Sequence, residues 1–270
     1  MRLSPAGQRF YQAVQKADGR INLAVAALYI AQEDYWDMDP TVYLEALDDM
    51  AGEVRSRLPV GRYPLKVIQV INTYLFEELK FSGNRLDYYN PDNSCLNCVI
   101  DRRLGIPITL SLLYLEIAHR IGFPMVGVGM PGHFLVRPVV DEMAVFVDPF
   151  NQGEVMFAID CQQKFHQLYG EQAQWQPEFL SGVLPKPFLA RILNNLKMIY
   201  LQLEAYDQAI ATLDKLLILM PGQVQQVRDR GLLHYQLENY DMAKQDLEGY
   251  LRSHPRASDG QEIQRILDRI

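Results

Sequence analysis

Three positions near the middle of the chain have the residue types and spacing that acyl-transfer chemistry needs. Gly105-Ile106-Pro107 opens an apolar helical segment, His133 follows the turn Pro131-Gly132, and Asp148 ends the apolar run VFVD. A helix start concentrates unpaired backbone N–H groups, which lower the pKa of a thiol placed there and stabilise an oxyanion. A histidine opposite that helix start would share the proton, and an aspartate on the next strand would hold the histidine tautomer. This order of groups is the logic of a cysteine–histidine–aspartate site.

The first eighty residues have the pattern of helices that would support such a site. Apolar residues recur at intervals of three and four between about residues 5 and 58, and again between residues 64 and 80. Asp39 followed by Pro40 has the order of an N-cap and a first-turn proline, which predicts a helix start there. The polar, turn-forming stretch at residues 87–94 predicts a surface loop.

The residues that carry the candidate site follow this loop. A short helix is predicted at residues 96–103 and a buried helix at residues 108–121, with Gly122 as its left-handed C-cap. Three β-like runs then predict antiparallel strands on that helix, so the fold class is α+β and mostly helical. One further helix is predicted around residues 161–168. Pro185-Lys186-Pro187 predicts a boundary linker, because two prolines so close are not expected inside a helix.

The last third of the sequence repeats itself with a period of 34 residues when Pro221 is aligned with Pro255. This is the length of a tetratricopeptide repeat, and small residues at Ala209 and Ala243 occupy equivalent corners in the segments LEAYDQA and LENYDMA. Two units are predicted, at about residues 190–223 and 224–257, followed by a capping helix. A stack of two is shorter than an independent solenoid usually is, so its other end is expected to lean on the preceding domain.

Composition narrows the classes of function. The chain has 270 residues, 49% of them hydrophobic and 22% charged, as in ordinary globular proteins. A formal net charge of −7 argues against an extended electrostatic contact with nucleic acid or anionic lipid. The sequence shows no apolar run long enough to span a membrane, no secretory signal and no disulfide framework, so a cytoplasmic protein is predicted.

The central region resembles a known family. The stretch from Asn90 to Pro138, which includes CLNCVIDRRLGIPITLSLLYLEIAHRIGFP and MPGHFLVRP, resembles the SirB-type proteins, as does the later VFVDPFNQGE. The helical opening INLAVAALYIAQEDY is also similar to that family. The resemblance implies a transglutaminase-like, papain-like core with a small antiparallel sheet, followed by a pair of tetratricopeptide repeats. It divides the chain into a helical region at 1–80, the core at 81–184 and the repeats at 185–270.

The resemblance also implies where a nucleophile would stand. His133 and Asp148 match the superfamily's histidine and aspartate, but Pro107 stands where the nucleophilic cysteine is expected. The resemblance therefore implies a residual dyad, His133 and Asp148, without its reacting atom. His133 has a purely structural alternative, as a loop residue that hydrogen-bonds Asp148, and Asp148 has one as a turn residue.

Other side chains are candidates to replace the missing nucleophile. Cys98, on the short helix upstream, is the alternative nucleophile, and it forms a CxxC pair with Cys95. Neither a second CxxC nor a nearby HxxxH accompanies the pair, so packing is favoured over metal or redox use, and neither a metal nor a cofactor is predicted. The hydroxyls of Thr109 and Ser111 would need a very well placed base to react, which favours helix packing for both residues.

Two functions follow from these observations. The first is a non-catalytic transglutaminase-like protein that acts as an interaction or regulatory module; the alternative is a hydrolase or acyltransferase that uses His133 and Asp148 with a non-standard nucleophile such as Cys98. Repeat helices form concave surfaces that bind extended peptides, so a protein or peptide partner is predicted. The candidate contacts, expected to be exposed, are Asn194, Asn195, Lys197, Arg228 and Arg230.

Overall fold

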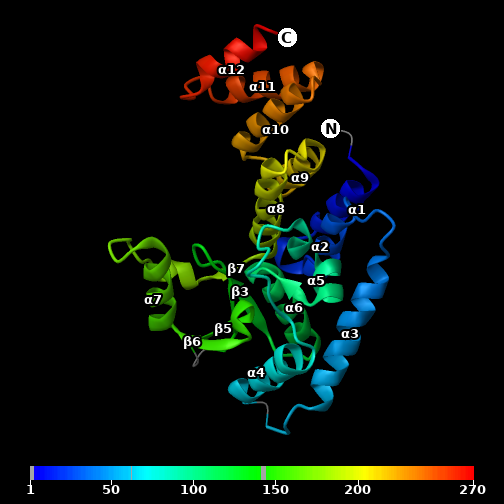
Figure 1. Cartoon of the computed structure of the whole chain (residues 1–270), viewed down its shortest axis with the longest axis vertical. Helices are drawn as coiled ribbons and strands as arrows, with labels where there is room; N and C mark the ends of the chain where they lie inside the picture. The colour runs from blue at the N-terminus through cyan, green and yellow to red at the C-terminus, as the bar shows by residue number, and fades with distance from the viewer. Residues whose placement is uncertain (1–2, 62, 141–143) are drawn as a thin grey trace.

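The computed structural model describes residues 3–61, 63–140 and 144–270 (Figure 1). The N-terminal third is helical, as predicted, and Asp39 caps its longest helix by accepting a hydrogen bond from the Thr41 N–H. The predicted helix at residues 64–80 widens into a π-helical turn before it ends. The elements of this region are α1 (Pro5–Val14), η1 (Asp18–Arg20), α2 (Leu23–Ala31), α3 (Pro40–Ser56), α4 (Pro64–Asn72) and η2 (Thr73–Glu78).

The polar stretch at residues 87–94 is only partly the surface loop that its turn formers predict. Residues 87–89 are exposed, but the stretch ends in a short 3-10 helix, η3 (Pro91–Ser94), where Asn93 is fully buried. The Asn93 amide donates to the carbonyls of Asp87 and Tyr88 and accepts from the Asn84 amide. Because one buried amide satisfies the backbone of the loop from inside, the second half of the stretch can enter the core.

A buried helix and an antiparallel sheet form the centre, as predicted. α6 (Pro107–Arg120) is buried over most of its circumference, and Gly122 follows it with φ 74°. Five of the described strands form one sheet in the order β6-β5-β4-β3-β7, so β6 and β7 extend the three strands that were predicted. The strands are β3 (Met125–Val128), β4 (Leu135–Pro138), β5 (Val145–Asp148), β6 (Glu154–Phe157) and β7 (Gly182–Val183).

Side chains alternate between the two faces of the sheet, and helices cover both faces. Val136 and Val145 belong to the core cluster that contains α6, whereas Leu135 and Phe146 pack with Cys161 of α7 (Ala158–Tyr169). α5 (Leu96–Arg102) and the short parallel pair β1 (Ser82–Gly83) and β2 (Leu104–Gly105) lead the chain into α6. Short 3-10 turns, η4 (Pro149–Asn151) and η5 (Pro177–Leu180), follow β5 and precede β7.

The predicted linker at Pro185-Lys186-Pro187 is wrong. Both prolines lie in the first turn of α8 (Pro185–Gln202), where a backbone N–H has no intrahelical partner and proline is tolerated. Phe188 of the same helix is buried and stacks edge-on against Phe134 of the core, with 4.8 Å between ring centroids. The repeats therefore begin inside the core of the preceding region instead of after a free connection.

The repeat helices extend away from the body of the molecule (Figure 1). α8 and α9 (Tyr206–Leu219) lie beside α1 and α2 and share their hydrophobic core, whereas the second pair and the last helix project outward. The second pair and the last helix are α10 (Val224–Gln236), α11 (Tyr240–Ser253) and α12 (Gly260–Leu267). Among the described helices, none is long and apolar enough to cross a membrane.

Candidate functional site

The structure brings Pro107 and His133 to the same small cavity. Its volume is about 30 Å³, room for roughly one or two water molecules. Pro107 contributes from the first turn of α6, His133 from the turn before β4, and Arg191 and Asn195 from α8. The remaining walls are Tyr88, Ile108, Gly132 and Phe134.

His133 and Asp148 form the pair that the sequence predicts. His133 Nε2 lies 2.8 Å from Asp148 Oδ2, and the Asp148 side chain is fully buried. An ionised carboxylate can only accept, so Nε2 donates the proton of this hydrogen bond, and Nδ1 is the ring nitrogen that Asp148 leaves free. The arrangement could accept a proton from a nucleophile, or simply order the turn before β4, and both roles stay predictions.

Asp148 has more partners than the sequence indicates. Lys164 Nζ lies 2.5 Å from Oδ2, the Asn151 side-chain amide donates to Oδ2, and the Asn151 backbone N–H donates to Oδ1. Burial by itself raises the pKa of Asp148, but the contacts with His133 and Lys164 outweigh it and lower the pKa to about 2. The spacing Asp-Pro-Phe-Asn is typical of a capped turn and could have predicted Asn151, whereas nothing in the local sequence points to Lys164, which lies on α7.

The lowered pKa of Asp148 predicts acid sensitivity of stability. A carboxyl group with a depressed folded-state pKa stabilises the native state above its unfolded pKa of 3.8 and loses that stabilisation as pH falls toward about 2. The pKa difference corresponds to about 2.5 kcal/mol, at about 1.4 kcal/mol per pKa unit. Asp148→Asn is therefore expected to be less stable than the wild type at pH 7, with the difference narrowing below pH 4. Urea unfolding at pH 7, 4 and 3 tests this, with Asp37→Asn, an exposed carboxyl, as control; an unchanged gap at all three pH values would contradict it.

The side chain opposite His133 has no nucleophilic atom. Pro107 is the first residue of α6, the position where its missing N–H costs nothing. Thr109, two residues later, uses its hydroxyl to accept from the Ile106 N–H and to donate to the Asn93 carbonyl at 2.6 Å. Ser111 is fully buried within α6. Neither hydroxyl lines the cavity, which fits the packing role predicted for both residues.

Cys98 does not lie at the His133 cavity. It packs with Cys95 and Ala31 and lines a different pocket, with Tyr35 and Asp101. Burial raises the pKa of the Cys98 thiol, although a hydrogen bond with Tyr35 opposes this. The alternative nucleophile that the sequence suggested is therefore neither beside the candidate base nor activated as a thiolate.

The three cysteines are free thiols in buried positions. Burial raises the pKa of Cys161 to about 12 and that of Cys95 well above the ordinary range. Among the described residues, no group of three or more His, Cys, Asp or Glu side chains is arranged to hold a metal ion.

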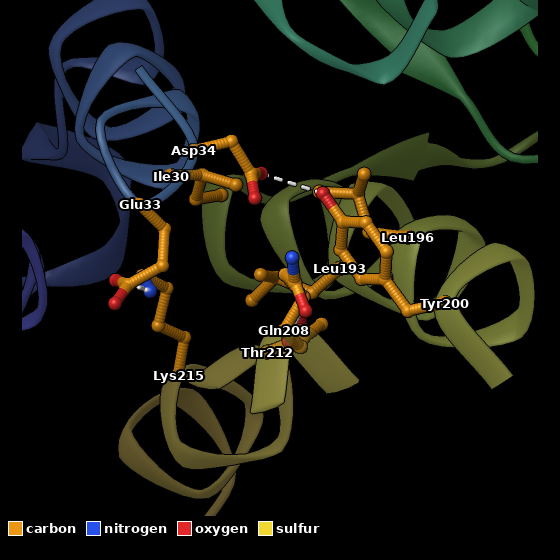
Figure 2. Close-up of a pocket in the computed structure, with 9 residues that line it drawn as sticks. All are labelled: Ile30, Glu33, Asp34, Leu193, Leu196, Tyr200, Gln208, Thr212 and Lys215. Carbon is orange, nitrogen blue, oxygen red and sulfur yellow. Dashed lines mark hydrogen bonds and ion pairs between the residues drawn. The ribbon is translucent and has the colours of Figure 1, made fainter. Parts of the chain in front are cut away.

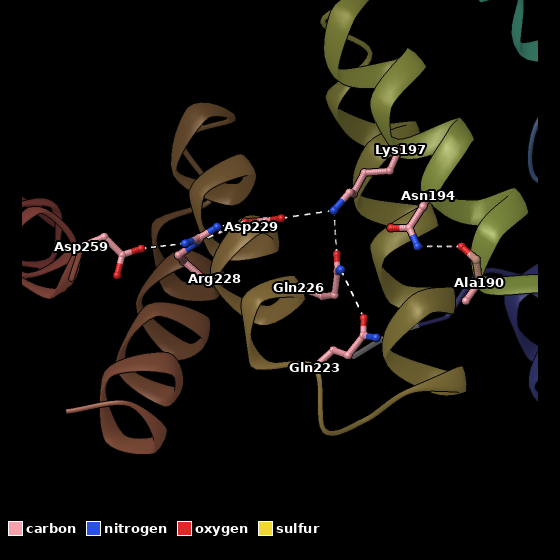
Figure 3. A network of polar contacts seen from close by, with 8 residues as sticks. All are labelled: Ala190, Asn194, Lys197, Gln223, Gln226, Arg228, Asp229 and Asp259. Atoms are coloured by element: carbon pink, nitrogen blue, oxygen red, sulfur yellow. Dashed lines mark hydrogen bonds and ion pairs between the residues drawn. The ribbon is translucent and has the colours of Figure 1, made fainter. Parts of the chain in front are cut away.

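The structure places the five predicted contact residues of the repeats in different surroundings. Lys197 and Arg228 belong to one polar network and Arg230 to a second. In Figure 3, Lys197 reaches from α8 to Gln226 and Asp229 of α10, and Arg228 bridges Asp229 and Asp259. The Asn194 side chain donates to the Ala190 carbonyl of its own helix, whereas Asn195 lines the His133 cavity.

The prediction that all five are exposed is wrong. Lys197 and Arg230 are buried, and the other three are half-buried. Arg230 forms a two-pronged pair with Asp246 and a third contact, at 2.5 Å, with Asp214. Burial of a guanidinium requires such compensation, so Arg230 joins α9, α10 and α11 and is unavailable to a partner.

The first repeat is attached to the N-terminal helices by a polar seam (Figure 2). Lys215 of α9 pairs with Glu33, which follows α2, and Tyr200 of α8 donates to Asp34 at 2.5 Å. Lys215 is almost completely buried by this contact. The seam, together with the shared apolar core, holds α8 against the core, with Arg191 and Asn195 at the His133 cavity.

Comparison with known proteins identifies both parts of the chain. A model of the transglutaminase-like superfamily matches residues 41–194, and a tetratricopeptide-repeat model matches residues 196–269. No solved structure matches the chain significantly.

Relatives extend the match to nearly the whole chain. A UPF0162 protein of Xylella fastidiosa (strain Temecula1) is 38% identical over 242 residues, which cover 88% of this chain and 86% of the relative. A UPF0162 protein of Vibrio cholerae is 31% identical over 67% of each chain. F-box only protein 21 of the mouse is 34% identical over 187 residues, which are 64% of this chain but 28% of that protein. The resemblance to the SirB-type proteins is thereby confirmed: the chain, which combines a transglutaminase-like domain with tetratricopeptide repeats, belongs to the UPF0162 family.

Proposed function

We propose that this protein is a non-catalytic member of the transglutaminase-like superfamily that acts as a protein-interaction or regulatory module. The observation that carries the proposal is the position of Pro107, which faces the candidate base His133 across one cavity without a nucleophilic atom. Covalent acyl transfer requires a nucleophile within hydrogen-bond reach of its base. The proposed function is therefore binding.

The covering of the cavity by α8 supports the same proposal. Arg191 and Asn195 close one side of it, and about 30 Å³ is far less than a peptide side chain and an attacking group would occupy. The core cluster that holds α8 in place is continuous with α2 and α6.

The architecture also favours a modular role. The match to F-box only protein 21 occupies 28% of that protein, so a similar stretch forms one part of a much longer chain there. The second repeat and α12 project from the body and leave helical surface for a partner (Figure 1).

The hydrolase or acyltransferase alternative, with Cys98 as its non-standard nucleophile, has a direct test. We expect iodoacetamide to leave Cys95, Cys98 and Cys161 unmodified in the native protein at pH 7, because all three are buried and their thiol pKa values are raised. Mass spectrometry of the intact protein, with a urea-unfolded sample as the positive control, measures the labelling. Selective modification of Cys98 that is lost in a folded His133→Ala variant would overturn the proposal and support the enzyme.

A further inference from the structure

The pocket that Cys98 lines has a composition unlike that of the His133 cavity, with which it shares no lining residue. It lies between the loop that joins α2 to α3 and the helix α5, and the first turn of α3 completes its walls. Its volume is about 330 Å³, which is at the lower end of the range for ligand pockets. We call it the acidic pocket, because three aspartates line it: Asp37, Asp39 and Asp101.

The three carboxylates of the acidic pocket have no cation as partner. Asp39 accepts a hydrogen bond from the Thr41 N–H, and Asp101 accepts one from the Tyr43 hydroxyl at 2.7 Å, so both contacts are with neutral donors. All three aspartates are exposed, and none forms an ion pair with a residue that the structure describes. Carboxylates gathered around one pocket without a counter-charge attract a cation to it.

The surface beside the acidic pocket has the same charge. Glu45 and Asp49 follow Val42 at three and seven residues, so they lie on the same face of α3, and both are exposed without an ion pair among the described residues. Arg102 of α5 does not neutralise the pocket, because its guanidinium pairs with Asp92 at 2.9 Å. The negative charge therefore extends from the pocket along α3, which favours a partner with more than one positive charge.

Asn97 is a second and independent sign of a ligand in the acidic pocket. It lines the pocket and is only 3% exposed, and its side-chain amide makes no hydrogen bond with any described residue. Asn97 and Asp101 are four residues apart on α5 and so share one face of that helix. A buried amide oxygen without a donor costs free energy. Because no hydrogen bond fixes this amide, a donor in the pocket can select the orientation that presents Oδ1 to it.

The remaining walls of the acidic pocket suit the hydrocarbon stem of a long cationic side chain. Met38 and Tyr43 line the pocket while packing against the core, and Val42 lines it with 57% of its surface exposed. Trp36, between two lining residues, is 80% exposed, and tryptophan is enriched among the residues that dominate protein interfaces. Lysine and arginine bury their stems along apolar surface of this kind and keep the charged end in polar surroundings.

We propose that the acidic pocket binds a lysine or arginine side chain from a basic segment of a partner protein. The charged N–H groups of that side chain would donate to the three aspartates and to Asn97 Oδ1, and its stem would lie against Val42. Further basic residues of the segment would face Glu45 and Asp49.

This inference rests on the proposed function and names the chemistry of the partner. The two fail separately. Loss of the binding described below would remove this site and leave an interaction role at another surface, whereas His133-dependent labelling of Cys98 would overturn the interaction role itself.

A synthetic peptide tests whether charge directs the binding. We expect a short fluorescein-labelled peptide of alternating arginine and glycine to bind the full chain saturably, as measured by fluorescence anisotropy. The same peptide with citrulline in place of arginine keeps the length and the N–H donors but loses the charge, and it is expected to bind at least about tenfold more weakly. Equal binding of the citrulline peptide would overturn the proposal, as would no saturable binding of the arginine peptide at up to about 1 mM.

Charge-neutral variants test whether the acidic pocket is the site. Asp37→Asn, Asp39→Asn and Asp101→Asn together remove its three charges, while asparagine still caps a helix and still accepts a hydrogen bond. This variant is expected to bind the arginine peptide at least about tenfold more weakly. The matched control removes three exposed carboxylates elsewhere, by Glu171→Gln, Glu178→Gln and Glu262→Gln. The control is expected to bind within about twofold of the wild type, and an equal loss in both variants would show that total charge and not the pocket attracts the peptide.

Asn97→Leu separates a binding role of this residue from a structural one. The substitution replaces an unpaired buried amide by an apolar side chain, so the free protein is expected to lose no stability in urea, whereas the arginine peptide is expected to bind about fivefold more weakly. Unchanged binding together with a loss of stability would contradict the role proposed for Asn97. If the variant without the three aspartates does not fold, hydrogen exchange in the wild type decides. Slowed exchange at residues 35–43 with peptide supports the site, and unchanged exchange there in saturated protein overturns it.

Discussion

Arg230→Met is expected to destabilise the repeat stack by about 3 kcal/mol or more, because it leaves two carboxylates buried without their cation. Asp246 is nearly inaccessible and Asp214 largely so, and Arg230 donates to both. The methionine fills most of the volume of the arginine stem, so the effect reports the lost charge and not a cavity. Urea unfolding followed by circular dichroism measures the stability, and hydrogen exchange should show α10 and α11 opening first.

Two further variants make the Arg230 result specific. Arg252→Met removes an arginine of the same stack whose side chain is 73% exposed and whose single ion pair, with Glu248, is long at 3.9 Å. The free energy of unfolding is therefore expected to change by no more than about 0.5 kcal/mol. Adding Asp214→Leu and Asp246→Leu to Arg230→Met removes the uncompensated charges and is expected to recover most of the loss. A single variant as stable as the wild type would show that this pairing contributes little to the stack.

Pro107→Cys is expected to create a reactive thiol where the wild type has none. The new side chain would stand at the first turn of α6 and face the His133 cavity. The helix N-terminus and a neighbouring imidazole both favour the thiolate, which lowers the pKa of a cysteine from its usual value of about 8.5. At pH 6 we expect iodoacetamide to modify this cysteine at least about tenfold faster than an ordinary exposed thiol, because the thiolate is the reacting species.

Variants at His133 and Leu203 give this experiment its controls. In the Pro107→Cys background, His133→Ala is expected to raise the thiol pKa and return the labelling at pH 6 to the ordinary rate. Leu203→Cys, at an exposed position after α8, gives the ordinary rate in the same protein. If there is no pH at which Pro107→Cys reacts faster than Leu203→Cys, then the remaining His133–Asp148 pair does not act on this position, and its role is structural.

The elements that could be predicted are those whose signals are local. The apolar run after Pro107, closed by Gly122, specifies a buried helix because both its periodicity and its cap lie within the segment. The equivalent corners at Ala209 and Ala243 specify the repeats for the same reason, and both alanines are fully buried between helices. The pair His133 and Asp148 follows from strand order, since consecutive antiparallel strands bring their ends together.

The predictions that failed depended on partners distant in the chain. Arg230 is predicted to be exposed because it is charged, but Asp214 and Asp246 surround it only when three helices stack. The segment that begins at Pro185 is interpreted as a linker because proline breaks helices. In the structure Phe188 packs in the core, and the two prolines lie in the first turn of α8. Cys98 is a candidate nucleophile because of its residue type, but in the folded protein it lies in a different cluster and pocket from His133.

By itself, the sequence determined the fold class, the repeats and the absence of a nucleophile at residue 107, because each is carried by residue type and local spacing. The tertiary structure decided which side chains meet: that Arg191 and Asn195 of α8 line the His133 cavity, and that Lys164 joins Asp148. These contacts depend on packing between segments far apart in the chain, and packing is set by the whole core and not by any one segment.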